Sequence, residues 1–309
     1  MNTVTADFDA EAGATDGESA TVRQVSFEVE GPVELDLTNV AGRVEARLVD
    51  EPGVHVELRY DPEAAGPWMT GLSGLFSWVS GQFGDTSGQH APAEAVRQTR
   101  IDMTGARLVV RTPHAGALRM VPIKIAVTAP HGSHLEVRSA SADVTVTGAA
   151  GRVQVTTGTG DVAVDRADGN AVVTSASGAL RLGPMLGGLR AKTGSGDVEV
   201  SSVGATTTLL TGTGDVWLGA VHNDVMARTG SGDLTVADAA AGRVELFTGT
   251  GEIRVAIRPG VVAEIDLVSG SGQARSELTI DSQPPGREPA LRVRGRTGTG
   301  DAVITTAVG

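Results

Sequence analysis

The chain has 309 residues, of which 40% are hydrophobic and 20% charged, a balance typical of a folded protein. Its formal net charge of −12 argues against nucleic acid as a partner, because phosphate binding requires clustered Lys and Arg. There is no cysteine, which excludes disulfides and thiolate chemistry. Aromatic residues make up only 3% of the chain, so we expect a narrow, regular core of aliphatic side chains.

The N-terminal segment is acidic and contains no basic residue before Arg23. A secretory signal begins with basic residues and continues with an apolar run, and this segment has the reverse character. We therefore predict a disordered acidic tail over residues 1–22. No later stretch is apolar and long enough to predict a transmembrane helix, which favours a cytoplasmic location.

Residues 23–309 are predicted to form a single β-solenoid domain. Its first part alternates apolar and polar residues over residues 25–60 and again over residues 100–137, as in Val33, Leu35 and Leu37. These stretches predict irregular N-terminal coils or a capping sheet, since a solenoid needs atypical ends that do not expose a pairing edge.

An insert at about residues 61–100 interrupts this alternation. Its uncharged stretch Gly66 to Gly84 places large apolar side chains on one face of a short helix: Trp68, Leu72, Leu75, Phe76, Val79 and Phe83. We predict a capping element over an open end of the solenoid. A partner-binding or membrane-surface segment is the alternative, which the lack of Lys and Arg disfavours. Removing residues 66–84 tests the prediction, because loss of a cap would change the assembly state and surface hydrophobicity.

An internal repeat dominates the rest of the chain. The segment TGTGDV at Thr157 recurs with small changes, and copies follow at steps of 18 residues from Ser139 to Thr229. Later copies begin at Thr248, Ser269 and Thr297, and their extra residues are rich in Pro and Gly, as loop insertions of a repeating coil would be. Apolar residues alternate at period 2 on both sides of each motif. The repeat therefore predicts an all-β solenoid with coils of about 18 residues and two short strands per coil.

The motif residues have a predicted structural role as corners of the stack. Only Gly or Ala avoids a clash where backbone approaches backbone, and Asp accepts hydrogen bonds from backbone N–H groups, as in an Asx-turn. Thr and Ser are expected to form ladders between coils. The predicted turn residues are Gly158, Gly160, Asp161, Gly194, Gly196, Asp197, Gly212, Gly214, Asp215, Gly230, Gly232 and Asp233.

The TGSGDV repeats, preceded by the segment PHGSHLEV at Pro130, resemble a bacterial family known as putative adhesins, a domain of unknown function. The resemblance covers roughly residues 25–305 apart from the insert. It implies a β-helix-like fold and, by the family name, attachment at a cell surface. It implies no catalytic residue.

Two chemical alternatives remain open. The carboxylates of Asp161, Asp197, Asp215, Asp233 and Glu252 would lie along one edge, where calcium could bind. A calcium-binding roll needs the motif every nine residues, however, and the other half of each repeat lacks it. A carbohydrate-active enzyme would need clustered carboxylates in a groove; Asp143, Asp161 and Arg181 could cluster by register, but short coils leave little material for a groove.

We therefore expect a non-enzymatic protein that needs no cofactor. It would present a flat surface rich in Thr, Ser and Asp to a protein partner, as an adhesin-like module or scaffold, or would stack end to end with other copies.

Overall fold

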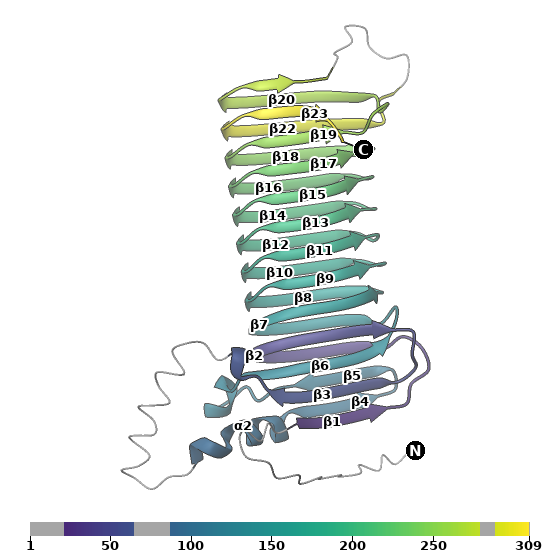
Figure 1. Cartoon of the computed structure of the whole chain (residues 1–309), viewed down its shortest axis with the longest axis vertical. Coiled ribbons are helices and arrows are strands. Elements are labelled where there is room, and N and C mark those ends of the chain that lie inside the picture. The colour runs from purple at the N-terminus through teal and green to yellow at the C-terminus, as the bar shows by residue number, and fades with distance from the viewer. Residues whose placement is uncertain (1–21, 65–86, 279–287, 309) are drawn as a thin grey trace, which may run out of the picture.

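The computed structural model describes residues 22–64, 87–278 and 288–308 and confirms an all-β solenoid (Figure 1). Its N-terminal part contains strands β1 to β6, helix α2 and two short 3₁₀ turns. Their bounds are β1 Val22–Phe27, β2 Glu34–Val49, β3 Val54–Tyr60, η1 Pro62–Ala64, α2 Ser87–Gln98, β4 Arg100–Thr104, β5 Arg107–Arg111, η2 Ala117–Met120 and β6 Ile123–Pro130.

The regular stack contains strands β7 to β23, two per coil after the long β7. Their bounds are β7 His134–Ala150, β8 Arg152–Thr159, β9 Val162–Ala167, β10 Ala171–Ser177, β11 Leu180–Met185, β12 Leu189–Ser195, β13 Val198–Val203, β14 Thr207–Thr213, β15 Val216–Val221, β16 Val225–Ser231, β17 Leu234–Ala239, β18 Gly242–Thr250, β19 Ile253–Ile257, β20 Ala263–Ser271, β21 Ala274–Ser276, β22 Leu291–Thr299 and β23 Ala302–Thr306.

The coils form two parallel sheets. Strand β8 pairs with the first half of β7 and with β10, and the even-numbered strands from β10 onward pair only with even-numbered strands. The odd-numbered strands from β9 onward continue the second half of β7 on the other sheet. We call these the even side and the odd side. Alternate residues point inward, so that Val153 and Val155 on β8 and Val162 on β9 have no solvent exposure. The predicted aliphatic core thus lies between the two sheets.

The coils at the C-terminal end do not stack in chain order. Strand β22 pairs with both β18 and β20, and β23 pairs with both β19 and β21. The last coil of the chain is therefore inserted beneath the preceding one, and β20 with β21 forms the outermost layer (Figure 1). Its inward-facing Ile265 and Leu267 are only partly buried, whereas Val293 of the inserted coil is 2% exposed.

The N-terminal end has a different construction. There β6 pairs in parallel with β2, but β3 pairs antiparallel with β6 and β1 antiparallel with β3. Strand β5 continues the even side beside β2 and pairs antiparallel with β4. Antiparallel strands therefore end both sheets, as a predicted capping sheet would.

Helix α2 covers this end of the stack and buries Ala95 and Val96 completely (Figure 1). A guanidinium N–H of Arg23 on β1 donates to the carbonyl of Thr99, just after the helix, at 2.6 Å. The predicted capping side chains, Trp68 to Phe83, lie outside the described residues, so their role stays a prediction. No helix in the described parts of the chain is long and apolar enough to span a membrane.

Candidate functional site

The repeated motif forms one whole edge of the solenoid, where each even-side strand turns into the following odd-side strand. The first Thr of each motif points inward. The Thr211 hydroxyl, 7% exposed, donates to the carbonyls of Thr213 at 3.1 Å and Gly196 at 3.3 Å. These hydroxyls bond to backbone carbonyls rather than to like side chains, and thereby satisfy turn groups inside the edge.

The second Gly of the motif has a conformation that side chains rarely adopt. Gly214 has φ of +138°, and a Cβ placed there would lie 2.3 Å from the carbonyl oxygen of Gly196 in the preceding coil. The first Gly, Gly212, would likewise bring a Cβ to 2.5 Å from the oxygen of Gly194. Close approach between coils together with positive φ therefore favours Gly at the second position, whereas two coils hold Ala140 and Ala176 at the first position.

The motif aspartates hydrogen-bond from coil to coil. Oδ1 of Asp197 accepts from the backbone N–H of Asp215 at 2.9 Å, and Oδ1 of Asp215 accepts from that of Asp233 at 2.8 Å. Asp161 accepts in the same way from Ala179, which has no carboxylate, so the row is interrupted there and resumes at Asp197. The bond predicted within the turn is instead a bond to the next layer, and it leaves the side chains exposed.

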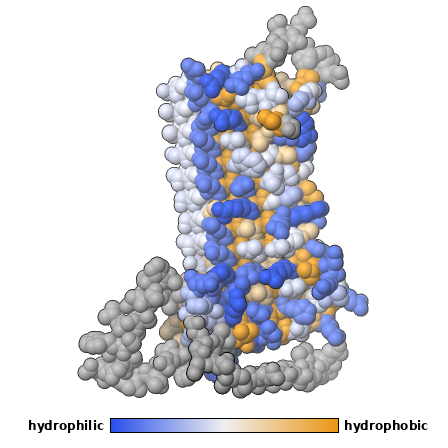
Figure 2. All heavy atoms as spheres, in the orientation of Figure 1, coloured by the Kyte–Doolittle hydropathy of each residue, from blue (hydrophilic) through white to orange (hydrophobic). Residues whose placement is uncertain are grey.

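Register also aligns the second Ser or Thr of each motif into one column, exposed except at the half-buried Ser177, which we call the hydroxyl ridge. It has no gap over nine successive layers, from Ser141 through Thr159, Ser177, Ser195, Thr213, Ser231, Thr250 and Thr299 to Ser271. Neighbouring strands lie about 4.7–4.9 Å apart, which sets the spacing of the hydroxyls. Figure 2 shows this edge as a pale ridge with a hydrophilic column beside it.

Neither chemical alternative finds a built site on this edge. Among the described residues no group of three or more His, Cys, Asp or Glu side chains is placed to hold a metal ion. Register does bring together the three residues considered for an enzyme. Arg181 lies 3.3 Å from Asp161, and Asp143 accepts from the N–H of Asp161. Both partners of the ion pair are more than half exposed, so water screens the pair.

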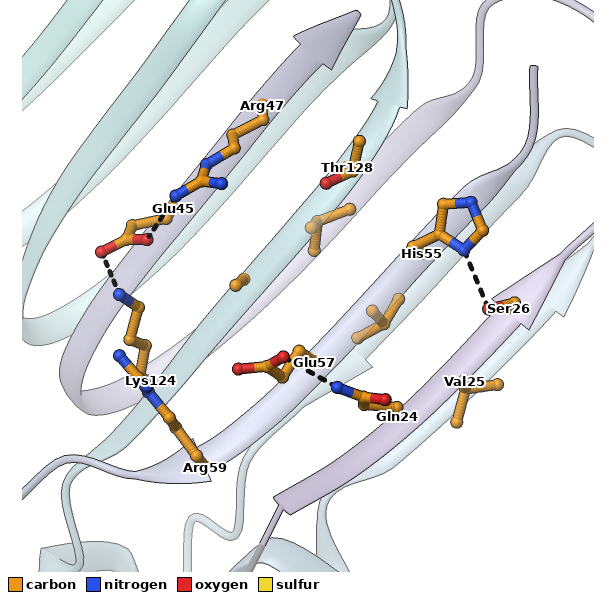
Figure 3. A pocket seen from close by; sticks show the side chains of 13 residues that line it. Gln24, Val25, Ser26, Glu45, Arg47, His55, Glu57, Arg59, Lys124 and Thr128 are labelled. Atoms are coloured by element: carbon orange, nitrogen blue, oxygen red, sulfur yellow. Dashed lines mark hydrogen bonds and ion pairs between the residues drawn. The ribbon is translucent and has the colours of Figure 1, made fainter. Parts of the chain in front are cut away.

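A second candidate site, a hollow of about 410 Å³, lies on the outer face of strands β1, β2, β3 and β6. Its charged lining consists of Glu45, Arg47, Glu57, Arg59 and Lys124, and Gln24, Ser26, His55 and Thr128 are the remaining polar residues. We call it the N-terminal hollow (Figure 3). It lies where the pairing of β6 changes from parallel with β2 to antiparallel with β3.

Several side chains of the hollow are already paired. Lys124 contacts Glu45, whose carboxylate is also 4.0 Å from Arg47. The amide of Gln24 donates to Glu57 at 2.9 Å, and the Ser26 hydroxyl lies 2.8 Å from Nδ1 of His55 (Figure 3). In a Ser–His hydrolase the second ring nitrogen bonds to an orienting acid. No such bond to His55 exists among the described residues.

Sequence reasoning missed the hollow for a physical reason. Its residues come from four segments that are brought together by pairings over long sequence separations, parallel between β2 and β6 and antiparallel between β6 and β3 and between β3 and β1. Each of them occupies an ordinary outward position of an alternating strand. No motif or spacing distinguished His55 or Arg59 from the solvated face of a sheet.

Comparison with solved structures finds distant similarity over nearly the whole chain. A putative adhesin from Bacteroides fragilis is 11% identical, with 92% of this chain and 97% of that chain covered and a TM-score of 0.43. A putative lipid binding protein from Parabacteroides distasonis is 10% identical, with 91% and 96% covered and a TM-score of 0.45. Similarity at this level says nothing about the function of this chain.

Sequence comparisons are more decisive. No curated protein matches the chain significantly. The model of the Toastrack DUF4097 family matches residues 115–305, which include β6 and the regular coils as far as the last residue but one of β23. The resemblance to a bacterial family of adhesin-like proteins with a domain of unknown function is thereby confirmed. Since the match spans more than half of its residues, the chain belongs to the Toastrack DUF4097 family.

Proposed function

We propose that this protein is a non-enzymatic binding protein that uses the hydroxyl ridge and the adjoining row of carboxylates to hold an extended polysaccharide. The observation that carries the proposal is the unbroken register of the ridge over nine layers. A surface with one hydroxyl per layer suits a partner that also repeats its hydrogen-bonding groups along a line.

The chemistry of the edge supports a polar, hydroxyl-rich partner. Each motif aspartate uses Oδ1 for the next coil, as Asp215 does for Asp233, and no hydrogen bond to Oδ2 of Asp215 occurs among the described residues. That oxygen can accept from a ligand hydroxyl, while the ridge hydroxyls can both donate and accept. Glycine beside the ridge, as at Gly212, keeps the surface low enough for a polymer to lie along it.

The backbone holds the edge rigidly before any partner binds. Amides and carbonyls of successive turns are bonded to each other, as in the bond from Gly214 N–H to the Ser231 carbonyl at 3.0 Å. A pre-organised surface loses little conformational entropy on binding, so many weak hydrogen bonds along it can add up to useful affinity.

Co-sedimentation with insoluble cellulose, chitin and peptidoglycan tests the proposal. The wild-type protein should pellet with at least one of them. Replacing two exposed ridge residues, Ser195→Lys and Thr213→Lys, should weaken that binding at least tenfold, because long side chains would hold the polymer off the edge. The matched control, Leu186→Lys with Thr206→Lys, places two lysines at exposed positions of the opposite edge and should bind like the wild type.

Two outcomes would contradict the proposal. One is wild-type protein that stays in solution with all three polymers. The other is a ridge variant that pellets as well as the wild type while remaining folded by circular dichroism. A protein partner or self-assembly would then account better for the exposed edge.

A further inference from the structure

The N-terminal hollow is separate from the hydroxyl ridge and has a different electrostatic character. Its charged lining contains three basic side chains, Arg47, Arg59 and Lys124, and two acidic ones, Glu45 and Glu57. The local charge is therefore positive by one in a chain whose formal net charge is −12. Because the hollow is positive within an otherwise acidic protein, it favours anionic ligands.

Arg59 is the cation in this hollow that is most available to a ligand. Lys124 is committed to Glu45, and its side chain is only 13% exposed. Arg59 is exposed and has no ion pair within 4 Å among the described residues, and Figure 3 shows it beside Lys124 in the wall of the hollow. A guanidinium offers several N–H donors in one plane, which suits a carboxylate or phosphate group.

The rest of the lining combines neutral polar groups with Val and Ala. Gln24 and Ser26 extend from β1, and Thr128 extends from β6. The ring of His55 uses Nδ1 towards Ser26, and Glu57 uses only one of its oxygens for Gln24. The second ring nitrogen and the second carboxylate oxygen can therefore bond to ligand hydroxyls.

We propose that the N-terminal hollow binds a small hydroxyl-rich anion, of the class of sugar acids and sugar phosphates. The anionic group lies on Arg59, and the hydroxyls face Glu57, His55 and Ser26. The volume of about 410 Å³ falls within the range of about 300–1,000 Å³ that is usual for small-molecule pockets. This site is independent of polysaccharide binding at the ridge, so either proposal can fail without the other.

Isothermal titration with four probes tests this inference: glucuronate, glucose 6-phosphate, glucose and inorganic phosphate. At least one of the first two should bind, and whichever binds identifies the carboxylate or the phosphate as the preferred anion. Glucose and inorganic phosphate should each bind at least tenfold more weakly, because each lacks one half of the recognised chemistry.

The variant Arg59→Ala should weaken binding of the anionic sugar at least tenfold, and Arg59→Lys should recover part of the loss. Arg190→Ala is the matched control, because Arg190 is an exposed outward arginine on the even side, and it should bind like the wild type. Arg59 is exposed, so its loss should leave the melting temperature nearly unchanged.

Three results would overturn the inference. The first is failure of both anionic sugars to bind. The second is binding that Arg59→Ala does not weaken. The third is inorganic phosphate that binds as tightly as glucose 6-phosphate, which would show a bare anion site without recognition of hydroxyls.

Discussion

At the scale of single residues, the second glycine of each motif is the position where the solenoid is least tolerant of substitution. Gly214 combines positive φ with a carbonyl oxygen 2.3 Å from the place of a Cβ, whereas Gly105 has positive φ, +58°, but no atom within 4 Å. Substitution of Gly105 therefore introduces backbone strain alone, whereas substitution of Gly214 adds steric overlap between coils. Without the neighbouring coil, Gly214 would be an ordinary turn residue.

We expect Gly214→Ala to lower the free energy of unfolding by at least about 3 kcal/mol, because overlap with backbone adds to the strain. Gly105→Ala should cost only the strain of left-handed backbone, about 1–2 kcal/mol. Urea unfolding of both variants measures the difference. Equal losses would mean that the coils can move apart at little cost.

In the aspartate row, a hydrogen bond between coils stabilises the fold and repulsion between neighbouring carboxylates opposes it. Substitutions at one position can separate these two effects. Asp215 accepts the N–H of Asp233, but its charge lies one strand from those of Asp197 and Asp233. Asp215→Asn keeps an acceptor and removes repulsion, so its stability should equal or exceed that of the wild type. Asp215→Ala loses the acceptor and should cost about 0.5–1.5 kcal/mol. If thermal unfolding ranks Ala above Asn, the hydrogen bond is not what the aspartate contributes.

At the scale of elements, the inserted C-terminal coil is the least expected feature. Arg294 on β22 lies in register between Glu245 on β18 and Asp266 on β20. Since the chain has no native cysteine, the order of layers can be tested by cross-linking. Neighbouring strands bring Cα atoms within disulfide range, and strands two layers apart do not.

The double variant Glu245→Cys with Arg294→Cys should therefore form a disulfide on mild oxidation. Glu245→Cys with Asp266→Cys should remain reduced. Mass spectrometry of peptides after alkylation reads out both. The reverse result would show that the coils stack in chain order.

The segment that leads from β19 past the inserted coil to β20 begins at Arg258. The guanidinium of Arg258 donates a hydrogen bond to the carboxylate of Asp238. The hydrogen bond from Arg258 lowers the pKa of Asp238, and partial burial opposes this shift. A lowered carboxyl pKa stabilises the fold above the carboxyl's ordinary pKa of about 3.9, and this contribution disappears as pH falls through the lower folded pKa.

Asp238→Asn should therefore cost stability at pH 6 but very little at pH 2.5. The loss at pH 6 should be about 0.2–1 kcal/mol, because both side chains are partly exposed and water screens the pair. Urea unfolding at the two pH values measures it. An equal loss at both would show that charge is not involved.

Much of this fold follows from local pattern. The period of 18 residues and the alternation around each motif predicted two strands per coil and an aliphatic core, because the same short-range rules act in every coil. The order of the last two coils could not be predicted, because the motifs at Ser269 and Thr297 are nearly alike. The strand that carries either motif, β20 or β22, could pair with β18. The hollow escaped prediction because it is built by pairing of segments that are distant in the sequence, two of the three pairings being antiparallel.

At the scale of the whole molecule, the solenoid is a rod with unlike ends and one edge that carries a Ser or Thr hydroxyl in each of nine layers. Helix α2 and antiparallel strands cover the N-terminal end, while β20 and β21 form the other (Figure 1). Stacking produces what no single coil has: a column of hydroxyls beside a row of carboxylates that Ala179 and Gln273 interrupt. We therefore propose this edge as the main binding surface and the N-terminal hollow as a separate small-molecule site.

The most direct test of the binding function is the alkylation rate of single cysteines in the presence of the polymer that sediments the protein. The account predicts that Thr213→Cys on the ridge reacts with iodoacetamide at least tenfold more slowly when the polymer is bound. Thr206→Cys on the opposite edge should react at an unchanged rate. Protection of Thr206→Cys instead, or of neither cysteine, would contradict the assignment of the ridge as the binding surface.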